Sequence, residues 1–375
     1  MLILFLAVLP LLAWLYLALA HGRFWQPLTY PPAETPRALP RLDIIVPARN
    51  EADILPLTLP ALLNQDYAGD WRVLLVDDHS QDGTAPVAHQ IAAATKRSER
   101  LRVIQAPDLP TGWSGKVAAM QAGVAQSDAE WILFTDADIW HPRFSLTQLI
   151  ASAESRKRDL VSRLVKLNST SLAEQLLIPA FVFFFALLYP FRRANDPHSP
   201  VAAAAGGVLL IRRAMLDKSG GLIGIKSALI DDCSLARAVK DSGGAIELTL
   251  TQDIHSLRPY PHFADIERMI ARTAYTQLRH APLLLLGTVL GMLLLFLAPP
   301  FFFFFATNLW ELLCGFFAFM LMSALYLPML RFYDLPRAYV LTLPFAALFY
   351  VGATLDSARQ SWRGTGGFWK GRAQA

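Results

Sequence analysis

Carboxylates grouped in pairs are the most conspicuous chemical feature of this sequence. Three pairs of aspartates each follow an apolar stretch: Asp77 and Asp78, Asp136 and Asp138, and Asp231 and Asp232. Paired carboxylates can hydrogen-bond sugar hydroxyls, hold a divalent cation or accept a proton from a reacting hydroxyl. The context of each pair separates these roles from a purely structural one.

The first pair belongs to VDDHSQDGT, residues 76–84. A calcium-binding loop is excluded, because position 12 of the frame that starts at Asp78 is His89 rather than glutamate. A structural turn with a helix cap remains an alternative. Adjacent acids at the end of a strand favour hydrogen bonds to a base N–H or to ribose hydroxyls, and Asp77 and Asp78 are therefore candidate nucleotide-binding residues.

A lysine in TGWSGK, residues 111–116, invites comparison with a phosphate-binding loop. The spacing between the two glycines is two residues too short, and Val117 stands where a serine or threonine would hold magnesium. An ATPase is thus excluded. Lys116 and the amides of the following helix start can still contact a diphosphate.

Asp136 and Asp138 directly follow a predicted strand. In an extended chain, residues i and i+2 point to the same side, so the two carboxylates could share one hard divalent ion, completed by substrate phosphates. A solvated loop is the alternative. The pattern predicts a site for a hard divalent ion such as Mg²⁺ at Asp138 and Asp136.

Asp231 and Asp232 lie at the predicted start of a helix over 233–240. Aspartates are common helix caps, and capping is one interpretation of this pair. The other is a general base that deprotonates an acceptor hydroxyl. The residues alone leave both interpretations open.

The elements that must position these side chains alternate regularly. Buried-strand patterns occur over 42–48, 71–78, 101–106 and 130–138, and helical patterns over 51–64, 84–96 and 116–126. Such alternation predicts an α/β fold with a mostly parallel sheet. In these sheets ligands bind beyond the carboxyl ends of the strands, where the polar residues of this chain gather.

Membrane elements are predicted at both ends of the chain. Hydrophobic residues make up 54% of the 375 residues and charged residues only 17%, against about 25% in soluble domains. Residues 1–20 carry no charge and predict an uncleaved anchor, although a cleaved signal peptide is the alternative. Residues 282–356 predict transmembrane helices, and residues 175–191 predict an interfacial helix because two prolines interrupt them.

Charge and cysteine content exclude other classes. The net charge is +4, without a basic stretch interleaved with aromatic residues, so no nucleic-acid partner is expected. Cys233 and Cys314 are too few for a disulfide framework and predict free thiols in a reducing compartment.

Taken together, the motifs resemble the family 2 glycosyltransferases of GT-A fold. The resemblance rests on VPARNE (46–51), VDDHSQDGT, GWSGKVAAMQAG, TDADIWHP, AAAAGG (202–207) and IDDCSLAR, in the order of the family. It implies a Rossmann-like catalytic domain that binds a nucleotide-sugar, a divalent ion at Asp-x-Asp, and Asp232 as the base. The present pair is Asp-Asp rather than Glu-Asp, and the Q-x-x-R-W signature of processive members is absent.

The same resemblance implies further site residues and an acceptor. Pro47, Arg49 and Glu51 would bind the nucleotide with the first aspartate pair. A finer similarity to hopene-associated glycosyltransferases rests on GWSGK, RTAYTQLRHAPLLLLGT, LRFYDLPR and WRGTGGFWKGR. It implies a membrane lipid acceptor of the hopanoid or polyprenoid type.

The resulting expectation is an inverting glycosyltransferase that depends on Mg²⁺ or Mn²⁺ and moves a sugar from a nucleoside-diphosphate sugar, with a UDP-sugar as the first choice, to a lipid in the bacterial cytoplasmic membrane. The predicted organisation is an anchor at 1–20, a linker at 21–41, a glycosyltransferase domain at 42–281, transmembrane helices at 282–356 and a basic tail at 357–375. Within the domain, 42–140 would bind the nucleotide-sugar and 141–281 the acceptor. A non-catalytic nucleotide-sugar-binding subunit and a polysaccharide-type synthase are the alternatives.

The topology of the C-terminal region poses a conflict. A multi-pass protein with a cytoplasmic catalytic domain and three C-terminal spans would place its tail outside, yet the basic tail favours the cytoplasm. We therefore expect one apolar segment not to cross, and residues 281–310, interrupted by Pro299 and Pro300, are the first choice.

Overall fold

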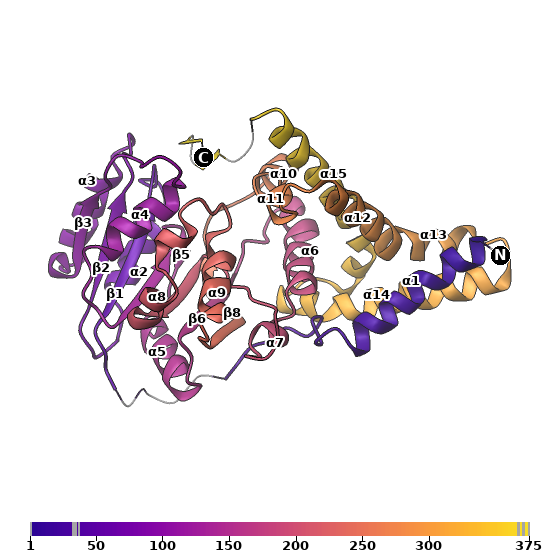
Figure 1. The fold of residues 1–375 in the computed structure, drawn as a ribbon, viewed down its shortest axis with the longest axis horizontal. Coiled ribbons are helices and arrows are strands. Elements are labelled where there is room, and N and C mark those ends of the chain that lie inside the picture. Colours follow the sequence, from indigo (N-terminus) through magenta and orange to yellow (C-terminus); the bar gives the residue numbers. More distant parts are fainter. Residues whose placement is uncertain (1, 32–35, 37, 366–367, 370–371, 374–375) are drawn as a thin grey trace. The chain divides into compact units, whose positions relative to one another are not determined.

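The computed structural model describes residues 2–31, 36, 38–365, 368–369 and 372–373 (Figure 1). The chain forms two compact units. We call the first the sheet unit; it comprises Leu28–Asn168, Arg193–Arg258 and Phe368–Ala375. The second, the helical unit, comprises Met1–Pro27, Ser169–Arg192 and Pro259–Gly367. This division differs from the expected boundaries, because residues 169–192 and 259–281 pack with the terminal helices.

Strands and helices alternate in the sheet unit. Its strands are β1 (Leu42–Ala48), β2 (Trp71–Asp77), β3 (Leu101–Gln105), β4 (Trp131–Thr135), β5 (Ile139–Trp140), β6 (Leu160–Lys166), β7 (Val208–Arg212) and β8 (Ile246–Ser256). Its helices are α2 (Leu55–Leu63), α3 (Thr84–Ala94), α4 (Gly115–Val124), α5 (Ser145–Ser155), α8 (Arg213–Lys218) and α9 (Asp231–Asp241), with 3₁₀ turns η1 (Ser98–Arg100) and η2 (Leu222–Ile225). The short hairpin β9 (Phe368–Trp369) and β10 (Arg372–Ala373) follows the last helix.

The sheet has the order β3-β2-β1-β4-β7-β6-β8-β5. Strands β3, β2, β1 and β4 are parallel to one another, as expected. The remainder is mixed, since β7 runs antiparallel to both β4 and β6, β8 runs parallel to β6, and β5 runs antiparallel to β8. The expectation of a mostly parallel sheet therefore holds for the first half and is wrong for the second.

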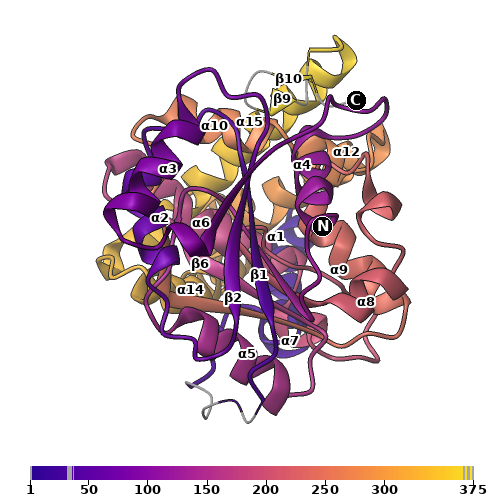
Figure 2. The same cartoon turned by 90° about the vertical axis from the view of Figure 1, so that its left-hand side faces the viewer.

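Helices cover both faces of this sheet. The apolar core on one face contains residues of α2, α3 and α5, and the core on the other contains residues of α4, α8 and α9. In Figure 2, α2 and α3 lie on one side of β1 and β2, and α4 and α9 on the other. Strands β1, β2 and β4 are buried almost completely, which explains their uninterrupted apolar sequences.

Two element boundaries differ from the prediction where the chain approaches the polar edge. The helix expected from residue 51 begins only at Leu55, because the amides of Asn50, Glu51 and Ala52 donate to side chains of the loop after β2. The strand expected over 130–138 ends at Thr135, and a turn follows in which Ile139 N donates to Asp136 O at 3.2 Å. Both candidate site segments are therefore loops.

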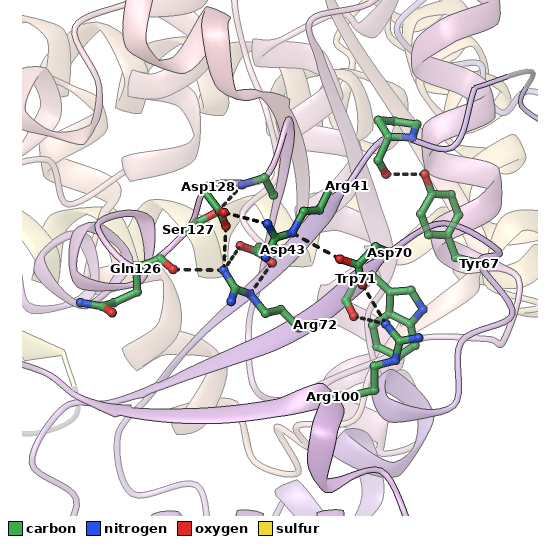
Figure 3. A network of polar contacts seen from close by, with 12 residues as sticks. Arg41, Asp43, Tyr67, Asp70, Trp71, Arg72, Arg100, Gln126, Ser127 and Asp128 are labelled. Atoms are coloured by element: carbon green, nitrogen blue, oxygen red, sulfur yellow. Dashed lines mark hydrogen bonds and ion pairs between the residues drawn. The ribbon is translucent and has the colours of Figure 1, made fainter.

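The opposite end of the parallel strands carries a network of ion pairs (Figure 3). Asp43, which is fully buried at the start of β1, accepts two hydrogen bonds from Arg72, at 2.8 and 3.0 Å. Arg72 also pairs with the exposed Asp128 at 3.1 Å, and Arg41 reaches the same carboxylate at 2.7 Å. The network ties together the starts of β1, β2 and β4.

Loss of the buried acid in this network should destabilise the sheet unit. Asp43→Ala leaves Arg72 without its buried partner, and we expect a loss of about 2–4 kcal/mol of unfolding free energy. The matched control is Asp128→Ala, whose side chain is 70% exposed, and which should cost far less unfolding free energy, because exposed ion pairs contribute little. Denaturant unfolding of the purified protein measures both. If the two substitutions lowered the unfolding free energy equally, the stabilising role given to the buried Asp43 would be wrong.

The helical unit is built almost entirely from apolar helices. They are α1 (Leu2–Leu19), α6 (Leu172–Leu188), α10 (Phe263–Ala271), α11 (Ala274–Gln277), α12 (Pro282–Met292), the π-helical turn η3 (Leu293–Leu297), α13 (Ala298–Phe305), α14 (Leu309–Phe332), the 3₁₀ turn η4 (Arg337–Thr342) and α15 (Leu343–Trp362). The short helix α7 (Phe191–Ala194) spans the junction between the two units.

Residues 282–305 form one continuous helical stretch despite Pro299 and Pro300. Proline has no N–H, so the carbonyl four residues before Pro299, that of Leu295, loses its normal helical donor. The local π-helical turn absorbs the irregularity, and the buried indole N–H of Trp14 donates to Leu295 O at 2.7 Å. Trp14 therefore fastens α1 to this helix by satisfying a carbonyl in apolar surroundings.

Three helical stretches are long and apolar enough to cross a membrane: Pro282–Phe305, Leu309–Phe332 and Arg337–Trp362. They correspond to the three apolar segments predicted at the C-terminus. The expected N-terminal anchor gives a shorter apolar helix, Ile3–Leu19, as does the expected interfacial segment, Leu172–Leu188. The basic tail at 357–375 lies partly outside the described residues.

Candidate active site

The polar loops that follow β1, β2 and β4 lie at one edge of the sheet, because these strands are adjacent and parallel. A small pocket at this edge is lined by Pro47, Lys116, Asp136, Gly206 and the Asp231-Asp232 pair. Its remaining wall is apolar, from α4, β4, β7 and α9. The pocket thus collects acids from distant parts of the sequence around one lysine.

Lys116, at the start of α4, joins two of the predicted acidic motifs. Its Nζ lies 2.9 Å from Asp136 Oδ1 and 3.4 Å from Asp231 Oδ2. Burial by itself lowers the pKa of Lys116, but the charges of Asp136, Asp231 and Asp232 outweigh it, so the net shift of the pKa is upward. A firmly protonated lysine in this place suits an anionic ligand such as a diphosphate.

Asp231 and Asp232 are the first two residues of α9, and the N-cap is Ile230. Neither aspartate is therefore the cap of this helix, and the predicted helix start at residue 233 was two residues late. Burial, followed by the neighbouring charge of Asp231, raises the pKa of Asp232 to about 6. This value is suited to a group that accepts a proton near neutral pH.

The backbone of the AAAAGG segment approaches Asp232 closely. Asp232 Oδ1 accepts a hydrogen bond from the amide of Cys233 at 2.7 Å. A Cβ atom at Gly206 would lie 3.2 Å from Lys116 Nζ and 3.3 Å from Asp232 Oδ2. Glycine thus allows the backbone to approach both charged groups closely.

Asp136 and Asp138 do not lie in an extended strand, so the geometric reason given for their pairing was wrong. They lie in the turn after β4, and each has a different cation: Asp136 pairs with Lys116, and Asp138 Oδ2 with Arg258 Nε at 3.2 Å. Burial, with the charge of Asp136 second, raises the pKa of Asp138. The two carboxylates are therefore close enough to repel each other.

A divalent cation bound between the two carboxylates would relieve this repulsion. Asp138 contacts Ser256 and Arg258 through Oδ2, and Asp136 contacts Lys116 through Oδ1, so the other oxygen of each carboxylate could bind a metal. Among the described residues, no group of three or more His, Cys, Asp and Glu side chains could hold a metal by itself. Two carboxylates completed by substrate phosphates and water suit Mg²⁺ or Mn²⁺.

The loops after β1 and β2 are joined to each other by hydrogen bonds and an ion pair. Arg49 Nη1 donates to Asp78 O at 2.5 Å and lies 3.6 Å from the Asp78 carboxylate, while Asp77 Oδ1 accepts from Ser80 N at 3.0 Å. A third acid of this motif, Asp82, has the structural role, because it accepts from the amides of Ala52 and Thr84. Asp77 and Asp78 are buried in this interlocked loop.

All the predicted site residues lie in the sheet unit, in three groups. Lys116, Asp136, Asp231 and Asp232 form one, with Pro47 at its wall; Glu51 and Asp138 form the second; and Arg49, Asp77 and Asp78 form the third. Sequence reasoning missed Arg258, which contacts Glu51 and Asp138, and Ser256, which donates to Asp138 at 3.1 Å. Ser256 is the last residue of β8 and Arg258 lies two residues after it. The sequence contains no recognisable motif in this segment.

This fold and these grouped acids define a GT-A-like α/β protein. The model of "Glycosyl transferase family 2" matches residues 43–220. An N-acetylglucosaminyltransferase of Bradyrhizobium sp. is 36% identical over 115 residues, which cover 30% of this chain and 70% of the relative. The chain belongs to glycosyltransferase family 2.

Two further comparisons extend this finding. An undecaprenyl-phosphate 4-deoxy-4-formamido-L-arabinose transferase of Pseudomonas fluorescens is 31% identical over 119 residues, 30% of this chain and 32% of the relative. A mannosyltransferase of Pyrobaculum calidifontis, solved with GDP-Man and Mn²⁺, has the same fold with a TM-score of 0.54 and 18% identity, covering 92% of this chain and 99% of that one. The matched part of the chain covers only 49%, 24% and 31% of the length of three curated relatives.

Proposed function

We propose that this chain transfers a sugar from a nucleoside-diphosphate sugar, such as a UDP-sugar, to the hydroxyl of a membrane lipid, with inversion at the anomeric carbon. The observation that carries the proposal is the pocket in which Lys116, Asp136 and the Asp231-Asp232 pair meet. It joins a cation for a diphosphate to a carboxylate with a pKa of about 6 in one place.

Each group has a definite role in this reaction. Asp232 accepts the proton of the acceptor hydroxyl as the oxygen attacks the anomeric carbon from the face opposite the diphosphate. Lys116 neutralises negative charge on the diphosphate, and the interlocked loops that hold Arg49, Asp77 and Asp78 bind the nucleoside. A divalent ion at Asp136 and Asp138 would stabilise the leaving group when bound.

A lipid acceptor is favoured by the helical unit. Its three long apolar helices are candidate membrane spans, and one relative is named an undecaprenyl-phosphate 4-deoxy-4-formamido-L-arabinose transferase. The similarity of GWSGK and the C-terminal motifs to hopene-associated enzymes suggests a hopanoid or another polyprenoid acceptor.

Nucleotide release tests this function directly. Purified protein, a panel of UDP- and GDP-sugars, Mg²⁺ or Mn²⁺ and a total membrane lipid extract should give free nucleoside diphosphate and a glycolipid detectable by mass spectrometry. Asp232→Asn is the matched control. Nucleotide binding without release from any donor would instead indicate the non-catalytic binding subunit, and a polymeric product would indicate a synthase.

Contacts within the helical unit suggest how the chain crosses the membrane. Helix α15 starts shortly after α14 ends, and its last turns contact the segment just before α12. Tyr275 N donates to Ser357 Oγ at 3.0 Å, His280 Nδ1 lies 3.2 Å from Ser361 Oγ, and Trp362 Nε1 donates to Tyr275 OH at 3.2 Å. The last turns of α15 therefore lie beside the start of α12. In a hairpin that crosses the membrane and returns, the start of α12 and the end of α14 are on the same side, so in this proposal α15 begins and ends on that side and does not cross.

The proposed spans are α1, α12–α13 and α14, with α15 along the membrane surface. This arrangement resolves the conflict over the basic tail in a different way from the one expected, because residues 282–305 form an uninterrupted helix of spanning length and α15 is the segment that returns. Arg331 lies in the last turn of α14, Arg337 begins η4 and Arg359 lies in the last turn of α15, whereas the turn at 306–308 has no basic residue. The positive-inside rule therefore places the catalytic unit and the tail in the cytoplasm.

Cysteine labelling in intact cells distinguishes these topologies. A cysteine at Ala306, in the hairpin turn, should react with a membrane-impermeant maleimide from outside. A cysteine at the exposed Thr365, after α15, should react only after permeabilisation. The unmodified protein gives the background from Cys233 and Cys314. Labelling at residue 365 in intact cells would show that α15 crosses.

A further inference from the structure

Three consecutive residues at the end of β8 converge on Asp138. Ser256 Oγ donates to Asp138 Oδ2 at 3.1 Å, Leu257 N donates to Asp138 O at 2.9 Å, and Arg258 Nε donates to Asp138 Oδ2 at 3.2 Å. The main chain and the side chain of the candidate metal ligand are thus both held by one short segment. Because Ser256 and Leu257 already fix its position, Arg258 is not needed merely to orient the carboxylate.

Arg258 also reaches a second acid. Its Nη2 lies 2.7 Å from Glu51 Oε2, so a single guanidinium joins the loop after β1 to the turn after β4. The side chains of Glu51 and Asp138 are only 8% and 15% exposed. Two acids with little access to water require a nearby cation, and in the metal-free protein Arg258 provides it.

We propose that Arg258 is a positioning residue that takes the place of the divalent ion at Asp138 until the nucleotide arrives. The inference rests on the proposed metal-dependent transfer. An ion and a guanidinium compete for the same carboxylate, so the ion alone binds weakly. A diphosphate brings negative charge that both cations can neutralise, so the ion and the nucleotide bind together.

The test is the affinity of the full-length protein for Mn²⁺, measured by electron paramagnetic resonance with and without UDP. Without nucleotide, Arg258→Gln should bind Mn²⁺ about tenfold more tightly, because one competing charge is gone. The gain in Mn²⁺ affinity caused by UDP should shrink by a similar factor. Arg258→Met, which keeps the apolar stem, should behave alike and serves if the glutamine variant does not fold.

Two matched variants control for charge and for general effects. Arg258→Lys keeps the competing charge and should retain an Mn²⁺ affinity near that of the unchanged protein. Arg156→Gln removes an arginine of the same unit that pairs with Glu247 at 3.4 Å, and it should leave Mn²⁺ binding unaltered.

The outcomes separate this inference from the proposed function. If Asp138→Ala abolishes Mn²⁺ binding but neither neutral variant of Arg258 tightens it, Arg258 only braces Asp138 and the inference is wrong, while the metal site stands. If the unchanged protein shows no Mn²⁺ binding that depends on Asp138, both the metal site and the role of Arg258 are overturned.

Discussion

Replacing Asp138 by alanine is expected to lower turnover by about 10³-fold or more, because a metal ion on a leaving diphosphate supplies several kcal/mol and each 1.36 kcal/mol is a factor of ten. The side chain lies in a turn at the edge of the sheet and not in the apolar cores, so the fold should survive. Turnover with saturating donor and Mn²⁺ measures the effect, and thermal unfolding verifies that the variant is folded.

A neighbouring acid of the same unit provides the control for this substitution. Asp253→Ala removes an exposed aspartate from β8 and should leave turnover within about twofold, as is usual for surface positions away from a site. Chelation by EDTA should reproduce the effect of Asp138→Ala in the unchanged protein. Full activity in EDTA, or in the Asp138→Ala variant, would show that Asp138 does not bind a catalytic metal ion.

Replacing Asp232 by asparagine is expected to lower turnover by about 10²–10⁴-fold, the range that general-base catalysis contributes. The asparagine side chain keeps the shape and can still accept from the amide of Cys233, so donor affinity should change little. Asp231→Asn should lose less, because Asp231 contacts Lys116 at 3.4 Å and acts through that lysine. Calorimetry of donor binding, alongside turnover, compares the two variants.

The pH dependence gives a second readout of the same base. Burial and Asp231 raise the pKa of Asp232 to about 6, and a base must be unprotonated to act. We therefore expect kcat/KM to be constant well above pH 6 and to fall about tenfold for each pH unit below it. A dead Asp231→Asn enzyme beside an active Asp232→Asn enzyme would reverse the roles, and normal turnover in both would place the base elsewhere.

The first half of the sheet could be predicted because its strands are buried on both faces. Strand β1 has the predicted bounds of 42–48, and β2 and β3 end one residue earlier than expected. Continuous runs of Val, Ile and Leu between polar turns are a strong local signal. The antiparallel placement of β7 between β4 and β6 has no such signal, since it depends on how a distant segment returns to the sheet.

Burial and long-range pairing explain what the sequence missed in the site. No local pattern links Arg258 to Glu51, which is 207 residues earlier, or to Asp138, 120 residues earlier. Likewise, the closeness of Gly206 to Lys116 and Asp232 comes from three separate elements. Such contacts are set by the fold, and a single sequence does not record them.

The sequence by itself predicted the candidate site residues and determined which segments are apolar, because residue type and local periodicity suffice for such predictions. It thus identified the three aspartate pairs, Lys116, the α/β alternation and the long C-terminal helices. Only the tertiary structure decided the partners: that Lys116 lies between Asp136 and Asp231, that Ile230 rather than an aspartate caps α9, and that the end of α15 returns to the start of α12. Partners depend on three-dimensional proximity between distant segments, which packing of the whole chain creates.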